Sequence, residues 1–222
     1  AIFCARGGYG TIRIIDKLNF TLFIKNPKWV IGFSDITVLH SSLNILRYCS
    51  IHSFMPINYD QTSKKNLKCL HDILFLGINK IECPPNSFNK TGQVKSEIVG
   101  GNLSILYSLL ASKSEISTDN KILFIEDLDE YLYHIDRMII SLKRAGKFNN
   151  LKALIVGGMT KMHDNKIKFG MSAKEIIKYH TDEFDFPICF DFPVGHIKNN
   201  CPLLLGKISK LSVSSKLVTL IQ

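Results

Sequence analysis

The sequence predicts an α/β fold, in which short buried strands alternate with amphipathic helices. Apolar runs such as Ile2–Ala5 and Trp29–Ile31 have the length of buried strands. Segments between such runs space their apolar residues three or four apart, as Ile36, Leu39 and Leu43 do, which is the period of a helix. Strands that alternate with helices usually form a parallel sheet covered by helices. We therefore expect a parallel sheet in this chain.

The first part of the chain is expected to start with a strand and a glycine-rich turn, Arg6–Gly10. Gly32 provides a second sharp turn between a strand and a helix. In chain order, the predicted elements are a strand at Ile2–Ala5, a helix at Thr11–Leu18, a strand at Trp29–Ile31, a helix at Ile36–Tyr48 and a helix at Asn66–Leu76.

A polar stretch that contains Pro84 and Pro85 interrupts this pattern and is typical of a linker. We therefore divide the chain into an N-terminal α/β domain at 1–83, a linker at 84–92 and a C-terminal α/β domain at 93–222. The second domain is expected to end in a β-hairpin. Its predicted elements are helices at Leu103–Leu110, Tyr133–Ala145 and Ala173–His180, and strands at Lys121–Ile125, Leu151–Val156, Pro187–Phe192, Ile208–Val213 and Leu217–Ile221.

The composition argues against several classes of function. The 222 residues are 45% hydrophobic and carry a net charge of +9, but the lysines are scattered and form no arginine-rich stripe, so nucleic acid is not expected as a partner. No apolar run approaches the roughly 18 residues that span a membrane, so no membrane association is expected. The six cysteines form no CxxC pair, which predicts neither a zinc site nor another metal site and favours reduced thiols in the cytoplasm.

The stretch from Trp29 to Thr37 has the pattern of a nucleophile elbow. A serine at a tight strand-to-helix turn projects its hydroxyl from the backbone, beside free N–H groups of the helix N-terminus. Ser34 is the candidate nucleophile, although capping the helix is the commoner role for a serine in this position.

Two further candidates follow predicted strands, Glu126 after Lys121–Ile125 and His196 after Pro187–Phe192. The ends of parallel strands open into one crevice, so these side chains can meet Ser34 as the acid and base of a serine hydrolase. Backbone N–H groups of Gly7 or Gly8 and of Asp35 could stabilise an oxyanion there.

Several residues compete for these roles. His40 and His52 are alternative bases, although the helix should direct His40 away from the elbow. Asp127, Asp129 and Glu130 are alternatives to Glu126, with loop support as the more common role of the two aspartates. The remaining histidines, His71, His134, His163 and His180, are expected at the surface without partners.

The glycine-rich turn is a poor nucleotide-binding motif, because Arg13 stands where a dinucleotide fingerprint requires its third glycine. Arg6 and Arg13 are candidates for binding a substrate carboxylate, with a structural salt bridge as the favoured alternative.

Six segments in order resemble the LD-carboxypeptidase (muramoyltetrapeptide carboxypeptidase) family, which includes microcin-immunity-type serine peptidases. Each segment is weakly specific alone, but together they span nearly the whole chain. One departure is His52–Pro56, where the family pattern has His-Gly-Pro, and this change is expected to reshape a loop near the site. The matching segments are Ala5–Gly10, Gly32–Thr37, Gly100–Leu103, Ile125–Glu130, Ile135–Arg137 and Pro193–His196.

The resemblance implies a fold, a triad and a reaction. The fold is a flavodoxin-like N-terminal domain, here lacking its first strand and helix, and a smaller C-terminal α/β domain, often in a homodimer. Ser34, Glu126 and His196 would form the triad, Asn102 would line the substrate pocket, and no metal or organic cofactor would take part. The implied reaction releases terminal D-alanine from a muropeptide tetrapeptide, by cutting an L,D amide bond during peptidoglycan recycling in the cytoplasm.

Two other functions stay open. One is an amide hydrolase that inactivates peptidyl-nucleotide antibiotics, which would need an aromatic surface for the base, and Trp29 belongs to a buried strand. The other is a non-catalytic peptide-binding protein. The sequence does not distinguish a lysine stem peptide from a diaminopimelate stem peptide.

Overall fold

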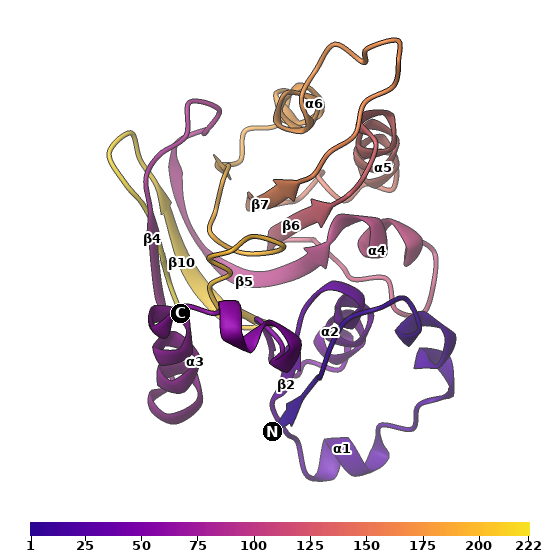
Figure 1. Cartoon of the computed structure of the whole chain (residues 1–222), viewed down its shortest axis with the longest axis vertical. Coiled ribbons are helices and arrows are strands. Elements are labelled where there is room, and N and C mark those ends of the chain that lie inside the picture. The colour runs from indigo at the N-terminus through magenta and orange to yellow at the C-terminus, as the bar shows by residue number, and fades with distance from the viewer.

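The computed structural model describes residues 1–222 as two β-sheets covered by helices (Figure 1). The first sheet has four strands in the order β1-β2-β3-β9, and the second has seven in the order β4-β11-β10-β5-β6-β7-β8. Both contain parallel strand pairs, so the predicted α/β class with a parallel sheet is confirmed.

The first sheet is small and holds the glycine-rich N-terminal segment. Its strands β1, β2 and β3 are parallel, and β9 pairs antiparallel with β3 from the far end of the chain. The strands are β1 (Ile2–Phe3), β2 (Val30–Gly32), β3 (Ser50–His52) and β9 (Leu203–Leu205); the helices of this part are α1 (Thr21–Lys25), α2 (Thr37–Ile45) and α3 (Lys64–Leu76).

The second sheet combines a parallel part with an antiparallel part. Strands β5 to β8 are parallel, whereas β10, β11 and β4 continue the sheet antiparallel, and β10 and β11 form the predicted hairpin. The strands are β4 (Lys80–Cys83), β5 (Gly92–Asn102), β6 (Ile122–Leu128), β7 (Ala153–Thr160), β8 (Ile188–Cys189), β10 (Ile208–Val213) and β11 (Val218–Ile221); the helices are α4 (Leu103–Ser108), α5 (Leu132–Arg144) and α6 (Ala173–Thr181).

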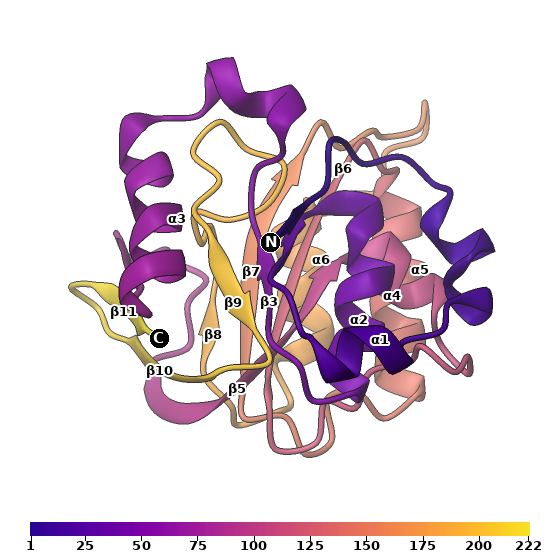
Figure 2. The ribbon, with the colours of Figure 1, turned by 90° about the horizontal axis from the view of Figure 1, so that it is seen from below.

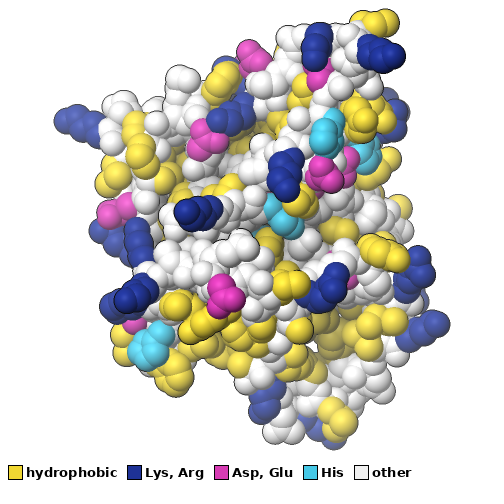
Figure 3. All heavy atoms as spheres, in the orientation of Figure 1, with side chains coloured by type: hydrophobic (Ala, Val, Ile, Leu, Met, Phe, Trp, Pro, Cys, Tyr) yellow, Lys and Arg dark blue, Asp and Glu magenta, His cyan; other side chains and the backbone are white.

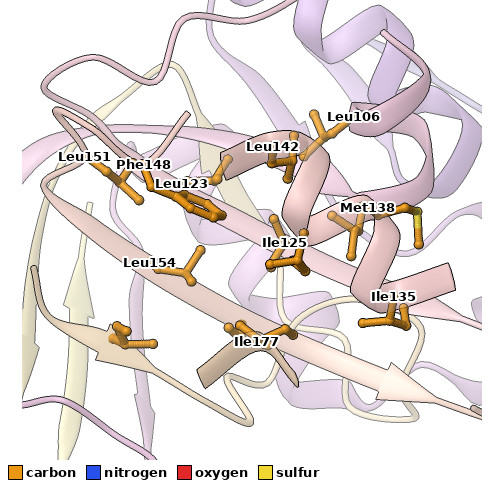
Figure 4. Packing of buried hydrophobic residues seen from close by; sticks show 14 of the residues in the cluster. Leu106, Leu123, Ile125, Ile135, Met138, Leu142, Phe148, Leu151, Leu154 and Ile177 are labelled. Atoms are coloured by element: carbon orange, nitrogen blue, oxygen red, sulfur yellow. The ribbon is translucent and has the colours of Figure 1, made fainter. Parts of the chain in front are cut away.

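The largest core lies between the parallel part of the second sheet and its helices (Figure 4). It contains 20 buried apolar residues, which include Leu123 and Ile125 of β6 and Ile135, Met138 and Leu142 of α5. These positions of α5 are three or four residues apart, as the sequence indicated. At about 1.5 to 3 kcal/mol for each buried side chain, this cluster provides much of the driving force for folding.

Helix α2 connects the two sheets, because it follows β2 of the first and packs against β5 and α4 of the second. Figure 2 shows α2 and α1 on one flank of the molecule and α3 on the opposite flank, beside β9 and β11. The end of β2 therefore faces the second sheet, and the elbow that follows β2 lies next to that sheet.

The predicted helix at Thr11–Leu18 is wrong, because the structure has two short 3-10 turns there, Thr11–Arg13 and Ile15–Lys17. Only Ile15 of these turns is buried, so no apolar face stabilises a continuous helix. Four strands, β3, β4, β5 and β9, and the short helix α1 were not predicted. Strand β4 lies in the second sheet and β9 in the first, so the chain crosses between sheets on both sides of 84–92. The division into domains at 84–92 stays a prediction.

Candidate active site

Ser34 occupies a strained turn between β2 and α2. Its φ of 64° lies in the left-handed region, which residues with a Cβ atom seldom adopt. The residue is half-buried, and it begins a 3-10 turn, Ser34–Ile36, that continues into α2. This geometry projects the hydroxyl away from the strand, as a nucleophile elbow requires.

The glycine-rich segment lies directly against this turn. A Cβ atom on Gly7 would come within 3.1 Å of Ser34 Cβ and 3.2 Å of Ser34 Oγ, so only glycine leaves the hydroxyl unobstructed. The N–H groups of Gly7 and Gly8 have no hydrogen-bond acceptor in the protein, and Asp35 N–H lies in the first helical turn, where no acceptor within the helix exists. The three N–H groups predicted to form the oxyanion hole are therefore free of protein acceptors, and Gly8 and Asp35 line the same hollow as Ser34.

The Asp35 side chain has a role that the sequence did not reveal. Its Oδ2 accepts hydrogen bonds from Gly10 N–H (3.1 Å), Thr11 N–H (3.0 Å) and Thr11 Oγ1 (2.7 Å). Because Asp35 follows Ser34 directly, this buried carboxylate attaches the glycine-rich segment to the elbow. Two features of the sequence could have indicated this contact. An acidic residue directly follows the candidate nucleophile, and the glycine-rich turn follows a strand of the same predicted sheet.

Glu126 and His196 form a buried acid–base pair. Glu126 is completely buried, and its Oε2 lies 2.7 Å from His196 Nδ1 and 2.9 Å from His196 N–H. A carboxylate only accepts hydrogen bonds, so Nδ1 carries the proton and Nε2 is left as the basic nitrogen. The pair has the geometry in which an acid fixes the tautomer of a general base.

Local backbone features place both members of this pair. Glu126 lies inside β6 rather than after it, at a register shift between Ile125 and Asp127, and such irregularities redirect a side chain. Gly195 has a φ of 108°, and a Cβ atom there would lie 2.7 Å from the Glu126 side chain. Thr160 Oγ1 donates to the His196 carbonyl (3.0 Å), which holds the histidine loop against the end of β7.

Phe33 connects the two halves of the site. Its ring packs against the His196 ring, with a centroid separation of 4.7 Å, and Ser34 follows it directly. No hydrogen bond joins Ser34 to His196 in this structure. Nucleophile–base contacts of this kind are often long without substrate and shorten in the reactive complex.

Two adjoining hollows flank the predicted triad. A cavity of about 860 Å³ is lined by Phe33, His196 and the 58–62 segment, and one of about 340 Å³ is lined by Gly8, Ser34 and Asn102. Leu128 borders both. The elbow borders both hollows as well, since Phe33 lines the larger one and Ser34 the smaller one.

Asn102 lines the Ser34 hollow, but its side chain is engaged in the structure. Its Oδ1 caps α4 by accepting from Ile105 N–H (3.2 Å), and its Nδ2 donates to Asp127 Oδ1 (2.8 Å). Asp127 also accepts from Ser104 N–H (2.9 Å). Burial, followed by the neighbouring charge of Glu126, raises the pKa of Asp127 to about 7. Asp127 thus supports the loop, as expected. Asn102 stays a predicted substrate contact because it borders the Ser34 hollow, although its side-chain atoms are already hydrogen-bonded.

The favoured salt bridges of Arg6 and Arg13 do not occur. Arg6 is exposed and forms no ion pair, and the Arg13 guanidinium lies 5.4 Å from the centre of the Tyr9 ring. Arg6 begins the segment that contacts Ser34, and it stays a predicted substrate-binding residue.

The two histidines that competed with His196 lie in the core. His40 is fully buried between Ser50 Oγ (2.8 Å) and the Gly32 carbonyl (2.9 Å), and burial lowers its pKa to about 4. Burial also lowers the pKa of His52, whose ring lies 5.7 Å from that of Phe33 and has no hydrogen-bond partner. Neither ring can reach a substrate. In the altered His52–Pro56 segment, Phe54 lines the larger cavity.

The other histidines have partners, contrary to expectation, and His180 is buried rather than at the surface. His134 pairs with Glu130 (2.6 Å), His163 with Asp129 (2.6 Å), His180 with Asp136 (2.7 Å) and His71 with Asp72 (3.3 Å). Asp129 and Asp136 lie 34 and 44 positions from their histidines, so local patterns do not show these pairs. Glu130 and Asp72 lie within four positions of theirs, so those two pairs were available from the sequence.

The structure contains no group of three or more His, Cys, Asp or Glu side chains arranged to hold a metal ion. None of its helices combines the length and the apolar character needed to cross a membrane.

Family models match most of the chain. Residues 95–211 match the LD-carboxypeptidase C-terminal domain, and residues 1–53 match the LD-carboxypeptidase N-terminal domain. Among curated proteins, the probable murein peptide carboxypeptidase of Bacillus subtilis is 30% identical over 97% of this chain and 70% of its own length. The murein tetrapeptide carboxypeptidase of Pseudomonas aeruginosa is 26% identical, over 95% of this chain and 72% of its own.

Solved structures resemble the fold over its full length. The muramoyltetrapeptide carboxypeptidase from Oxalobacter formigenes has a TM-score of 0.88 and 25% identity, covering 99% of this chain and 77% of its own. The microcin C7 self immunity protein MccF, without ligand, has a TM-score of 0.86 and 20% identity, covering 100% of this chain and 75% of its own.

Proposed function

Since this chain belongs to the LD-carboxypeptidase family, we propose that it is a serine carboxypeptidase that releases terminal D-alanine from muropeptide tetrapeptides by hydrolysing an L,D amide bond. The observation that carries the proposal is the 2.7 Å pair of His196 and Glu126 beside the strained Ser34 elbow. We also propose that the protein acts in peptidoglycan recycling in the cytoplasm and assembles as a homodimer.

The proposed reaction begins when Ser34 Oγ attacks the carbonyl carbon of the scissile amide and His196 Nε2 accepts the hydroxyl proton. The N–H groups of Gly7 or Gly8 and of Asp35 stabilise the oxyanion that forms. His196 then donates its proton to the leaving amine, which departs as D-alanine and leaves an acyl-serine. Water attacks this ester with His196 again as base, and the shortened peptide is released.

Glu126 acts through His196 in this scheme. Its carboxylate holds Nδ1–H and so directs Nε2 toward the substrate. It also stabilises the imidazolium that forms in both steps, and its complete burial strengthens that interaction.

The test is the release of D-alanine from a purified tetrapeptide muropeptide by the intact chain and by Ser34→Ala. We expect the variant to lose about 10⁴-fold or more of kcat/KM, as removal of a triad member does. Ser108→Ala, which changes an exposed serine on α4, is the matched control and should keep full activity.

Persistent release by a folded Ser34→Ala protein would remove Ser34 from its role. No release by either folded protein would favour another amide substrate or a binding protein without activity.

One observation favours the peptidyl-nucleotide alternative. Tyr131 and Tyr133 are 43% and 41% exposed, and they follow Asp129 and Glu130, which border the Ser34 hollow. Their rings lie 5.6 Å apart, and the His163 ring lies 5.4 Å from that of Tyr131. These three rings form an aromatic surface of the kind that a nucleotide base requires, and local sequence patterns did not indicate it. Cleavage of an aminoacyl sulfamoyl adenosine, reduced in Tyr131→Ala and Tyr133→Ala with D-alanine release unchanged, would support it.

A further inference from the structure

The larger cavity is bordered by two lysines with no partner in the protein. Lys161 and Lys198 both line the cavity that contains the His196 edge, and neither takes part in a salt bridge or a side-chain hydrogen bond. The other charged group that lines it is Asp60. Figure 3 shows Lys or Arg side chains close to a histidine near the centre of this face.

Both lysines lie close to His196, one through a hydrogen bond of the preceding residue and the other through its position in the chain. Lys161 follows Thr160, whose hydroxyl donates to the His196 carbonyl (3.0 Å), and Lys198 lies two residues after His196. Lys161 also has a φ of 52°, a left-handed conformation that a lysine seldom adopts. Strained residues of this kind concentrate at functional sites.

The proposed chemistry defines what must lie beside His196. Because His196 donates a proton to the leaving amine, the leaving residue sits next to its ring. That residue is the last of the peptide, so its free carboxylate is one carbon atom away from the amine. A carboxylate in this position needs a cation or hydrogen-bond donors, and the lysines are the cations available on this side.

We propose that Lys161 and Lys198 form the subsite for the terminal carboxylate of the leaving residue, and so restrict the enzyme to the last bond of a peptide. This inference rests on the proposed function. An amidated or extended peptide places a neutral group between the two ammonium groups and loses the ion pairs. Asp60, the acidic side chain that lines the same cavity, repels a carboxylate that approaches it instead of the lysines.

The test compares a tetrapeptide that ends in a free D-alanine carboxylate with the same peptide carrying a C-terminal amide. For the intact protein we expect the acid to have a kcat/KM at least about 100-fold above that of the amide. Lys161→Met and Lys198→Met should each raise KM for the acid about 10-fold, and the double variant should bring the acid-over-amide ratio of kcat/KM down to about 1. The double variant with Lys161→Arg and Lys198→Arg should keep much of the preference for the acid over the amide.

Lys210→Met, which removes an exposed lysine of β10 away from the cavity, is the matched control and should behave as the parent protein. A double variant that keeps the acid-over-amide ratio would overturn the subsite. The same peptides are also compared with a lysine and with a diaminopimelate stem. One result would contradict the proposal, namely a double variant that no longer distinguishes the two stems but still prefers the acid to the amide. In that case the lysines bind the side-chain carboxylate of the diaminopimelate stem instead of the terminal carboxylate.

A binding measurement separates this inference from the proposed activity. Calorimetric titration of Ser34→Ala with the acid and amide peptides should show tighter binding of the acid, and this difference should disappear when both lysines are replaced. Equal binding of the two peptides overturns the subsite. A lysine-dependent preference without any turnover by the intact protein would uphold the subsite and contradict the carboxypeptidase activity.

Discussion

The two halves of the candidate site are built in contrasting ways. Ser34 belongs to the small first sheet, where the core around the elbow has five buried apolar residues and β1 is exposed along both of its residues. Glu126 belongs to β6, between clusters of 20 and 17 buried apolar residues. The proposed nucleophile therefore lies in the thinly packed part of the molecule, and the proposed acid–base pair lies in the densely packed part.

This difference matches the demands of each role. A nucleophile must project from a strained turn toward the substrate, and here backbone strain is held by a few polar contacts, chiefly those of Asp35. A buried carboxylate and its histidine need a fixed geometry and a low dielectric, and a close-packed sheet supplies both. The ratio of lost activity to lost stability should therefore differ between substitutions in the two halves.

The largest effect should come from Glu126→Gln in the densely packed half. The amide keeps the volume but no longer stabilises the imidazolium, so we expect kcat to fall about 10³- to 10⁴-fold with the melting temperature nearly unchanged. Muropeptide turnover and thermal unfolding measure the two quantities. A kcat within a factor of ten of the parent would show that Glu126 does not orient His196.

Gly195→Ala should disturb the same half through packing. The new methyl group would meet the Glu126 side chain at 2.7 Å, on a backbone with a φ of 108°. We expect about 2 to 4 kcal/mol of lost stability together with a large loss of activity. Gly170→Ala is the control, because its φ is 88° with no atom near the added methyl group. Equal losses in both variants would mean that backbone strain alone, rather than the contact with Glu126, is responsible.

Gly7→Ala tests the thinly packed half. Its methyl group would lie 3.1 Å from Ser34 Cβ, where the open surroundings let the segment move aside. We expect about a 10- to 100-fold loss of kcat/KM from the displaced hydroxyl and oxyanion donors, with a stability change below about 1 kcal/mol. Gly10→Ala, which meets nothing within 4 Å, should leave both unchanged. A loss of stability as large as that of Gly195→Ala would contradict the contrast between the halves.

The smallest net effect is expected in the pH dependence of stability, because the two halves respond in opposite directions. Burial lowers the pKa of His40 from 6.5 to about 4, so the unfolded chain binds more protons and His40 makes the protein more stable as the pH rises from 4 to 6.5. The raised pKa of Asp127, from 3.8 to about 7, makes the native state bind more protons and lowers stability as the pH rises from 4 to 7.

Urea unfolding between pH 4 and 7 measures these slopes. His40→Gln should remove the rising contribution and Asp127→Asn the falling one, each changing the free-energy difference across this range by about 1 to 3 kcal/mol. A variant whose slope matches that of the parent would show that the residue does not titrate in this way.

The sequence pointed to the candidate site residues, whose roles stay predictions, but it did not show several of the strands that carry them. Ser34, Glu126 and His196 were identified because motifs at strand ends leave a local pattern of glycines and polar residues. The short strands β3 and β9 were missed because three-residue segments have no periodicity of their own, and β3, Ser50-Ile51-His52, has only one apolar residue. Strand β4 does alternate, as Lys80-Ile81-Glu82-Cys83, but four residues are too few to separate a strand from a turn.

The amino-acid sequence by itself determined the α/β class, the elbow at Gly32–Thr37, the amphipathic face of α5 and the hairpin of β10 and β11, because each depends on contacts between residues close in the chain. Tertiary structure alone decided that β9 completes the first sheet and that Gly195 lies against Glu126, 69 positions earlier. It also decided that the Asp35 carboxylate holds the glycine-rich segment and that Lys161 and Lys198 border one cavity. Such contacts arise where distant segments bury surface against one another, and local patterns of polarity and spacing carry no record of them.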